Sequence, residues 1–176
     1  MSKLKLLSVV IILFLVGTLT ASAGSPHFIG TVSFSDGSFR MTASIAGLGN
    51  IPVTVRMDAY ANITALCKNE EGYTTPGSNP ISVTETTSAV SNHNGRSSFD
   101  LVVPDPLKAS PPPPLPSAKA AGCADYHNWW VVGFVPDSTR WTGAKVSVFD
   151  NSTGALVIQQ NYTCTGVGKS LACTPA

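Results

Sequence analysis

Apolar residues recur at every second position over much of the chain, which is the period of a β-strand with one buried face. The clearest case covers residues 53 to 65, where an apolar side chain occupies every odd-numbered position. Residues 28 to 34 and 39 to 45 show the same period on either side of Asp36-Gly37, a dipeptide that favours a tight hairpin turn. We expect two strands joined in a hairpin, followed by a third strand with one face in the core and the other in water.

Residues 68 to 80 interrupt this alternation. They are polar and contain a Pro-Gly turn, which predicts a long surface loop. Residues 81 to 90 are rich in threonine and β-branched side chains, and clear alternation returns at residues 98 to 103. Because the turn-forming residues 92 to 95 lie between these two runs, we expect the runs to form a second hairpin.

Seven prolines dominate residues 104 to 122, and this composition prefers extended polyproline geometry over pairing in a sheet. We interpret the segment as a crossover between two sheets. Residues 129 to 135 are apolar on both faces, as expected for a central strand or for a strand with an exposed aromatic ring. Residues 145 to 149 and 155 to 163 flank a glycine-containing turn and predict a third hairpin.

No run of ten or more residues after residue 23 shows a helical stripe. Short strands with turns between them and one proline-rich crossover predict an all-β fold, an antiparallel β-sandwich of the immunoglobulin-like type. The immunoglobulin hallmark is a cysteine on each of two facing strands with a tryptophan between them, and it is not obvious here. A jelly roll or a β-barrel is therefore an open alternative.

The N-terminal residues have the pattern of an export signal. Residues 1 to 23 combine a basic start, an apolar run over residues 6 to 16 and a small-residue cleavage pattern at residues 21 to 23. This pattern predicts a secretory signal peptide. A membrane anchor is the alternative, but the apolar run is shorter than the ~20 residues that span a bilayer. We expect residues 24 to 176 to form a single secreted domain with no membrane span.

Composition excludes two further classes. Apolar residues make up 43% of the chain, which is too many for a disordered tail. Charged residues make up 12% and the formal net charge is only +1, whereas a protein that binds nucleic acid carries a strongly basic surface. We expect no nucleic-acid partner.

The four cysteines, Cys67, Cys123, Cys164 and Cys173, all follow the predicted signal peptide, and an oxidising compartment favours disulfides. Four cysteines permit three pairings. We favour Cys164 with Cys173, which closes a short glycine-containing loop, and Cys67 with Cys123, which ties a strand to the far side of the proline-rich segment. Zinc is the rival interpretation, but no Cys-x-x-Cys spacing occurs and the three histidines are isolated, so we expect no metal.

Recognisable catalytic motifs are missing from the sequence: it has no nucleophile elbow, no His-Glu-x-x-His and no phosphate-binding loop. Asp125 and His127 are the only close pair of an acid and an imidazole, and we interpret them as part of a solvated turn. Glu70-Glu71, with Asp105 or Asp125 nearby, could offer oxygens to Ca²⁺, but a charged loop tip is the simpler interpretation. We expect a non-enzymatic protein without a cofactor.

Aromatic residues form the most suggestive cluster. Candidate binding residues are Tyr126, Trp129, Trp130 and Trp141, which lie close together in the chain, and Tyr73 in the predicted loop. Exposed flat rings stack on sugars or contact protein partners. Trp129 and Trp130 are adjacent on a predicted strand, so they point to opposite faces and only one can join a surface platform. We expect a polysaccharide or a cell-surface protein as the partner.

Several turn-rich motifs carry a resemblance: Ala46-Gly47-Leu48-Gly49-Asn50, Cys67-Lys68-Asn69, Pro76-Gly77-Ser78-Asn79-Pro80, and Asn94-Gly95 with Phe99. In their order and spacing, residues 27 to 163 resemble a family of small uncharacterised secreted proteins from Gram-positive soil bacteria. The resemblance implies an exported, all-β, disulfide-bearing domain and no particular activity. The chain departs from the family pattern at Cys123-Ala124-Asp125, where Cys-Pro-Asn is expected, and in having Cys164 and Cys173.

Three N-glycosylation acceptor patterns begin at Asn62, Asn151 and Asn161. They are candidates for modification. Given the bacterial resemblance, we favour the interpretation that they are ordinary polar surface positions.

Three functions are compatible with these observations. The first is an extracellular binding or adhesion module whose contact region is the loop 68 to 80 with the aromatic group near Trp129. The second is a structural component of the cell envelope or spore surface that self-associates through its edge strands. The third is a hydrolase that uses Asp125, His127 and a further carboxylate. For this function we expect an activity screen to find no hydrolysis.

Overall fold

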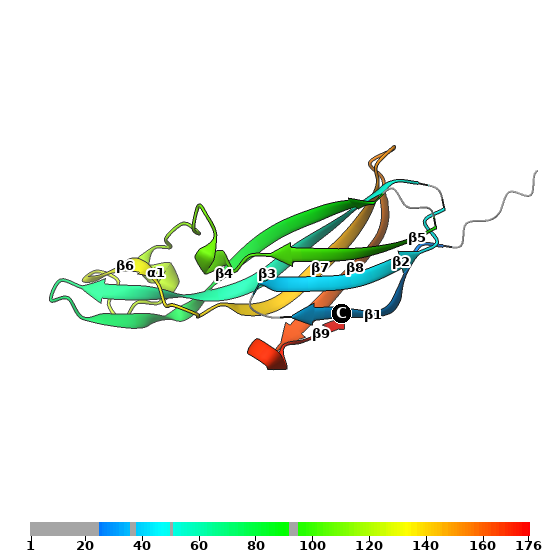
Figure 1. Ribbon diagram of the computed structural model, residues 1–176. Helices are drawn as coiled ribbons and strands as arrows, with labels where there is room; N and C mark the ends of the chain where they lie inside the picture. Colours follow the sequence, from blue (N-terminus) through cyan, green and yellow to red (C-terminus); the bar gives the residue numbers. More distant parts are fainter. Residues whose placement is uncertain (1–24, 36–37, 50, 92–94) are drawn as a thin grey trace, which may run out of the picture.

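The computed structural model describes residues 25–35, 38–49, 51–91 and 95–176. The predicted signal peptide and the turn dipeptide Asp36-Gly37 lie outside these residues. The described chain forms two antiparallel sheets packed face to face (Figure 1). The predicted all-β sandwich is therefore confirmed. The immunoglobulin-like subtype stays a prediction, since neither disulfide joins the two sheets.

Sheet A has the strand order β1-β2-β5, and sheet B has the order β4-β3-β7-β8-β9, with β6 also paired to β3. The strands are β1 (His27–Ser35), β2 (Phe39–Ala46), β3 (Val53–Asn69), β4 (Thr74–Ser91), β5 (Arg96–Val103), β6 (Trp129–Phe134), β7 (Arg140–Asp150), β8 (Leu156–Thr165) and β9 (Ala172–Pro175). The helical segments are η1 (Pro106–Lys108), α1 (Ala118–Ala121) and η2 (Gly168–Ser170).

Alternating side chains of β2, β3, β5 and β7 form the main hydrophobic core between the sheets. The ring of Phe39 on β2 lies 4.7 Å from that of Trp141 on β7, measured between centroids. Tyr162 of β8 packs edge-on against Phe34 of β1, with 4.9 Å between the rings. Each large apolar side chain that leaves water contributes about 1.5–3 kcal/mol, so these contacts hold the two sheets together.

The two longest strands, β3 and β4, have 17 and 18 residues and run past the end of sheet A (Figure 1). On the side of β3 away from β4, β7 pairs with residues 53–62 and β6 with residues 65–69. We call the two packed sheets the body. We call the extension, made of residues 64–81 and 117–135, the tip.

The predicted loop at residues 68–80 is wrong. β3 continues to Asn69 and β4 begins at Thr74, so residues 70–73 alone connect the two strands. Proline is disfavoured in a central strand because it lacks an N–H for the ladder, but an edge strand tolerates it. β4 is such an edge strand, and it contains both prolines of this segment.

The predicted second hairpin is also wrong. β4 pairs with β3 in sheet B, whereas β5 pairs with β2 in sheet A, where Phe39 lies opposite Val103. The chain therefore changes sheets between β4 and β5, and a buried bond of 2.7 Å joins the hydroxyls of Ser91 and Ser97 at this change. Alternation identifies which face of a strand is buried but not which strand is its neighbour.

The first and third predicted hairpins are confirmed, because β1 pairs with β2 and β7 pairs with β8. Both favoured disulfides form, Cys67–Cys123 in the tip and Cys164–Cys173 in the body. The second of these joins β8 to β9, a C-terminal strand that no alternation in the sequence predicts. Among the described residues, no helix is long and apolar enough to cross a membrane.

A buried carboxylate lies on the outer face of sheet B. Asp58 accepts hydrogen bonds from Thr86 Oγ1 at 2.9 Å and from Arg56 Nε at 2.8 Å. Lys145 Nζ lies 3.1 Å from its second oxygen. Burial alone would raise the pKa of Asp58, but these three partners outweigh it and hold the pKa below its usual value. The cluster links β4, β3 and β7 across their shared face.

Candidate functional site

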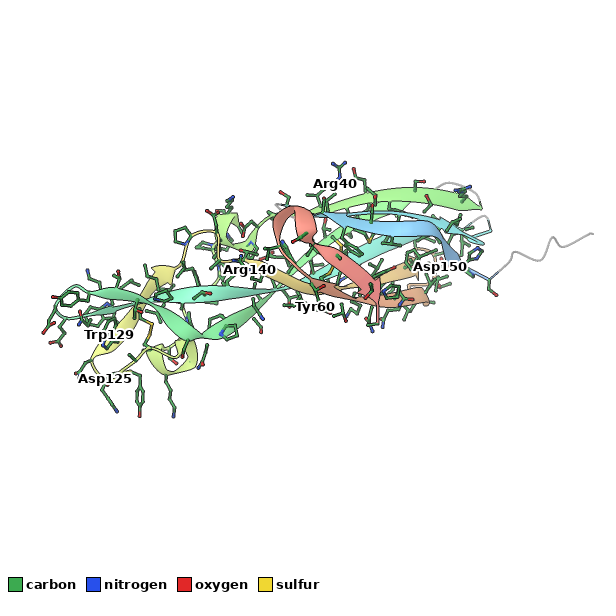
Figure 2. All side chains as sticks on the ribbon, turned by 90° about the horizontal axis from the view of Figure 1, so that it is seen from below. Arg40, Tyr60, Asp125, Trp129, Arg140 and Asp150 are labelled. Atoms are coloured by element: carbon green, nitrogen blue, oxygen red, sulfur yellow. A yellow bond between two sulfur atoms is a disulfide. The ribbon has the colours of Figure 1, made fainter. Side chains whose placement is uncertain are left out.

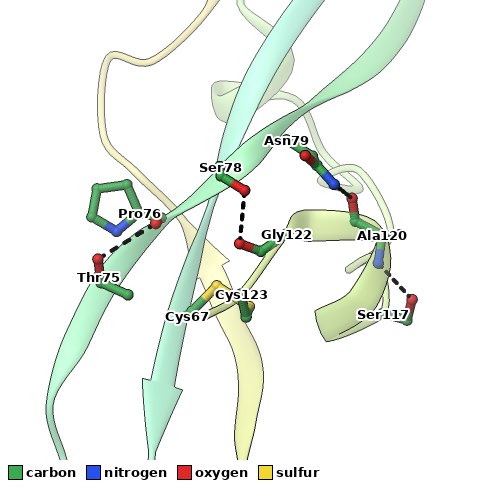
Figure 3. Close-up of a disulfide and its surroundings, with 9 residues drawn as sticks. All are labelled: Cys67, Thr75, Pro76, Ser78, Asn79, Ser117, Ala120, Gly122 and Cys123. Atoms are coloured by element: carbon green, nitrogen blue, oxygen red, sulfur yellow. Dashed lines mark hydrogen bonds between the residues drawn. A yellow bond between two sulfur atoms is a disulfide. The ribbon is translucent and has the colours of Figure 1, made fainter. Parts of the chain in front are cut away.

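The tip has a small core of its own, closed by a disulfide. Its buried residues are Ala65, Cys67, Ala121 and Cys123. The disulfide joins β3 to the chain just after α1, with 5.9 Å between the two Cα atoms (Figure 3). Ser117 caps α1, because its Oγ accepts a hydrogen bond from the N–H of Ala120 at 3.2 Å. A disulfide and a capped turn hold α1 against β3, and the partly buried side chains of Ile81, Trp129, Val131 and Phe134 pack around this small core.

The motif at residues 76–80 fastens β4 to the α1 segment. Ser78 donates twice to the carbonyl oxygen of Gly122, from its N–H at 3.2 Å and from its Oγ at 3.0 Å. Asn79 donates from Nδ2 to the carbonyl oxygen of Ala120 at 3.2 Å (Figure 3). These bonds satisfy carbonyl groups at the C-terminal end of α1, which the helix itself leaves without partners.

Gly77 lies where a side chain would not fit. A Cβ atom at this position would be 2.2 Å from the carbonyl oxygen of Ala121. Gly122, on the other side of the contact, has a φ of 68°, in the left-handed region that favours glycine. The two glycines therefore allow β4 and the α1 segment to approach as closely as they do.

The two adjacent tryptophans of β6 point to opposite faces, as expected for neighbours on a strand. Trp129 packs against the tip core. Trp130 lies opposite Lys68 of β3 in the ladder, and 44% of its surface is exposed. Val132, two residues further along β6, is also exposed. Of this pair, Trp130 is the residue available for contact with a partner.

Trp130 belongs to a face of the tip that looks away from α1. Paired residues on neighbouring strands place their side chains on the same face, and Thr74 of β4 pairs with Lys68, which in turn pairs with Trp130. Pro76 pairs in the same way with Leu66. We call the resulting set the open face; it comprises Leu66, Lys68, Thr74, Pro76, Trp130 and Val132.

The open face combines apolar surface with charge. Lys68, opposite Trp130 in the ladder, supplies a cation to this face. The adjoining hairpin turn carries the exposed acids Glu70 and Glu71 and the ring of Tyr73, which is 67% exposed. A flat apolar surface with polar groups around it is the arrangement that binds sugar rings or protein side chains. Lys68 was not among the candidates from sequence, because its neighbour depends on the register between β3 and β6.

Tyr126 is exposed but lies on the other side of the tip. Its ring is 5.9 Å from Nζ of Lys119, a residue of α1, and 4.2 Å from the ring of His127. The structure therefore separates Tyr126 from Trp130, although the two are only four positions apart in the chain. The predicted aromatic cluster is not one continuous surface.

The expectation that Trp141 is a binding residue is wrong. It is only 3% exposed and stacks on Phe39 in the core of the body. Figure 2 places the preceding residue, Arg140, where the tip meets the body, apart from Trp129 in the tip. Trp141 pairs with Ala61, whose side chain lies on the core face of β3, so the ring points toward sheet A and away from solvent.

The carboxylate of Asp125 is engaged in a turn. It accepts a hydrogen bond from the backbone N–H of His127 at 3.1 Å and another from Nδ2 of Asn128 at 2.6 Å. These two bonds, the one from His127 foremost, lower the pKa of Asp125. A carboxylate with a lowered pKa is a weaker base, and the His127 ring lies against Tyr126. The arrangement agrees with the interpretation of a solvated turn.

Two kinds of candidate remain, the possible metal ligands and the sequon asparagines. Among the residues that the structure describes, no group of three or more His, Cys, Asp or Glu side chains is placed to hold a metal ion. Of the sequon asparagines, Asn151 and Asn161 are exposed, whereas Asn62 is half-buried and accepts a hydrogen bond from Ser82 Oγ at 3.1 Å.

The amino-acid sequence matches no protein-family model, and comparison with curated proteins and with solved structures gave no match. Function is therefore inferred from the geometry of the tip.

Proposed function

We propose that the protein is a secreted, non-enzymatic binding or adhesion module and that the open face of the tip is its contact surface. The ligand class that fits this surface best is a polysaccharide. A sugar ring presents a flat apolar face that stacks on an indole, and hydroxyl groups that bond to the polar groups around it.

The exposed indole of Trp130 carries this proposal. Large aromatic side chains dominate the energetics of contact surfaces because they combine a large apolar area with few rotatable bonds. The tip buries its core on the face of the sheet that packs against α1. Folding therefore does not require a large aromatic side chain on the opposite face, where Trp130 lies. Its position on a strand that is anchored beside a disulfide supplies the rigid support that a contact residue needs.

Secretion is supported by two independent features. The sequence predicts a signal peptide over residues 1–23. Both cysteine pairs are disulfide-bonded, and structural disulfides persist in oxidising compartments outside the cytosol.

A retention assay on polysaccharides and cell-wall material tests the proposal. We expect Trp130→Ala to weaken retention by about thirtyfold, the factor that corresponds to loss of a central aromatic contact. The matched control is Tyr126→Ala, because it also removes an exposed aromatic ring from the tip but on the α1 side. We expect this control to bind within about twofold of the wild type.

Each outcome of the assay decides something. Equal losses in the two variants would contradict the open face as the contact surface. Failure of the wild-type protein to bind any polysaccharide would overturn the ligand class, and binding to a cell-surface protein with the same dependence on Trp130 would replace it.

A further inference from the structure

Along the body, the outer edge of β4 pairs with no other strand of the described residues. β4 is the terminal strand of sheet B, and its pairing partner is β3 alone. An unpaired edge offers a row of N–H and C=O groups on which another strand can add. The question is which residues of β4 present these groups.

The hydrogen bonds of β3 on its other side show which residues these are. The carbonyl oxygen of Thr64 on β3 accepts from the N–H of Val135, and that of Pro52, just before β3, accepts from the N–H of Asn151. Both acceptors are even-numbered, and both donors lie on the side of β3 away from β4. Tyr60 likewise accepts from Thr142 Oγ1 on β7. Even-numbered residues of β3 therefore direct their backbone away from β4.

In an antiparallel pair, two residues opposite each other direct their N–H and C=O groups either toward one another or both away. The β4 partners of these residues therefore direct their backbone groups outward, to the free edge of the sheet. The register pairs Tyr60 with Thr84 and Asp58 with Thr86, and it continues unbroken from Ser82 to Val90. The outward-facing residues are Ser82, Thr84, Thr86, Ser88 and Val90. No described residue bonds to their outward backbone groups.

Protection of this edge is uneven. In the tip, prolines 76 and 80 lack an N–H, and the bonds of Ser78 and Asn79 to the α1 segment cover the edge between them. Residues 82–90 carry no proline and no lysine, which are the usual devices that stop a strand from adding. Their single charge is that of Glu85.

We propose that a second copy of this chain pairs with β4 antiparallel, about a two-fold axis at Thr86. In that register Thr86 faces its own symmetry mate, Thr84 faces Ser88, and Ser82 faces Val90. On the other face of the strand, Glu85 meets Thr87, so that no like charges lie opposite each other. Threonine and serine pairs across strands stabilise a sheet, and an isologous contact of this kind closes as a dimer.

A groove lies beside one end of this edge. It has a volume of about 420 Å³ and lies between residues 81–85 of β4 and prolines 111–114. In the proposed register, residues 87–90 of the second copy enter it. The two-fold axis repeats this contact, so each copy contributes one groove and fills the other.

Sedimentation of the secreted protein tests the dimer. We expect the wild type to sediment as a dimer at micromolar concentrations and above. A wild type that stays monomeric throughout this range would overturn the proposal.

Two charged double variants test the register. Thr84→Lys with Ser88→Lys places like charges opposite each other twice per dimer, and we expect it to weaken association about tenfold or more. Thr84→Lys with Ser88→Glu introduces the same number of charges but sets opposite signs against each other, and we expect it to restore the dimer. Neither hydroxyl bonds to a described residue, so both variants should fold, which circular dichroism and a thermal transition would verify.

The comparison between the two variants decides the register. If they associate equally well or equally poorly, the two-fold pairing at Thr86 is wrong. The open face is unchanged in both, so retention on polysaccharide separates this result from the fate of the proposed function.

Discussion

The body and the tip share β3 and β4 but are stabilised in different ways. In the body, both sheets contribute large side chains to one continuous core, which includes Phe39, Met57 and Trp141. In the tip, four residues are buried, two of them alanines and two of them the halves of a disulfide. The same pair of strands therefore passes from a region held by a large buried core to one held by a covalent bond, close backbone contacts and partly buried side chains.

This difference bears on function. A core that must be buried cannot also be presented to a ligand, and in the body the aromatic rings are used for packing. Because the disulfide and the α1 segment support one face of the tip, the other face is free to expose Trp130. The following predictions test whether the two regions depend on different interactions, from the largest expected effect to the smallest.

Removal of a core ring from the body should have the largest effect. We expect Trp141→Ala to lower the free energy of unfolding by about 3–5 kcal/mol, because it leaves a cavity beside Phe39. The control is Trp130→Ala in the tip, which should change stability by no more than about 0.5 kcal/mol. Urea denaturation measures both. Similar losses in the two variants would contradict the assignment of Trp141 to the core and Trp130 to the surface.

Removal of the disulfide in the tip should come next. The Cys67–Cys123 bond spans 56 positions, for which chain entropy predicts a contribution of about 4 kcal/mol. The Cys164–Cys173 bond spans 9 positions and should contribute about 2.5 kcal/mol. We expect the double variant Cys67→Ala with Cys123→Ala to unfold at lower urea than Cys164→Ala with Cys173→Ala. The reverse order would mean that the tip does not depend on its disulfide.

A single methyl group should disturb the tip. We expect Gly77→Ala to cost about 1–3 kcal/mol, since its Cβ would collide with the carbonyl oxygen of Ala121. The matched control is Gly133→Ala on β6, where a Cβ meets nothing within 4 Å. Thermal denaturation of the two variants measures the difference. If both are equally stable, the close contact between β4 and the α1 segment does not hold the tip.

The buried carboxylate of the body should give a smaller, pH-dependent effect. The folded pKa of Asp58 lies below the unfolded value of about 3.9, so its stabilisation is present above that value and is lost as pH falls through the folded pKa. We expect Asp58→Asn to cost about 1–2 kcal/mol at neutral pH and to reduce the loss of stability below about pH 4. Urea denaturation at several pH values checks this. An unchanged acid dependence would contradict the role of Asp58.

The sequence predicted the buried faces of strands better than their ends and partners, and the reason is physical. Alternation of apolar residues from 53 to 65 reports one buried face, and that is how β3 packs in both regions. Residues 68 to 80 are polar and contain a Pro-Gly pair, which predicts a loop, yet an edge strand loses nothing where a proline lacks an outward N–H. The short strand β9 was missed because its position depends on β8 and on the Cys164–Cys173 bond.

The candidate site shows the same limit. Adjacency of Trp129 and Trp130 on a strand was enough to predict that one is packed and the other exposed. Sequence proximity then grouped Tyr126 and Trp141 with them, although α1 and sheet A draw these two residues to other places. Lys68 lies opposite Trp130 because of the register between β3 and β6. No local sequence pattern encodes that register.

Native-state hydrogen exchange tests most directly whether the body and the tip are separate units of stability. We predict that amides of α1 and β6 exchange through local opening, with opening free energies below that of global unfolding, whereas amides of β2 and β7 exchange only by global unfolding. Equal opening free energies in the two regions, with the tip as well protected as the core of the body, would contradict this account.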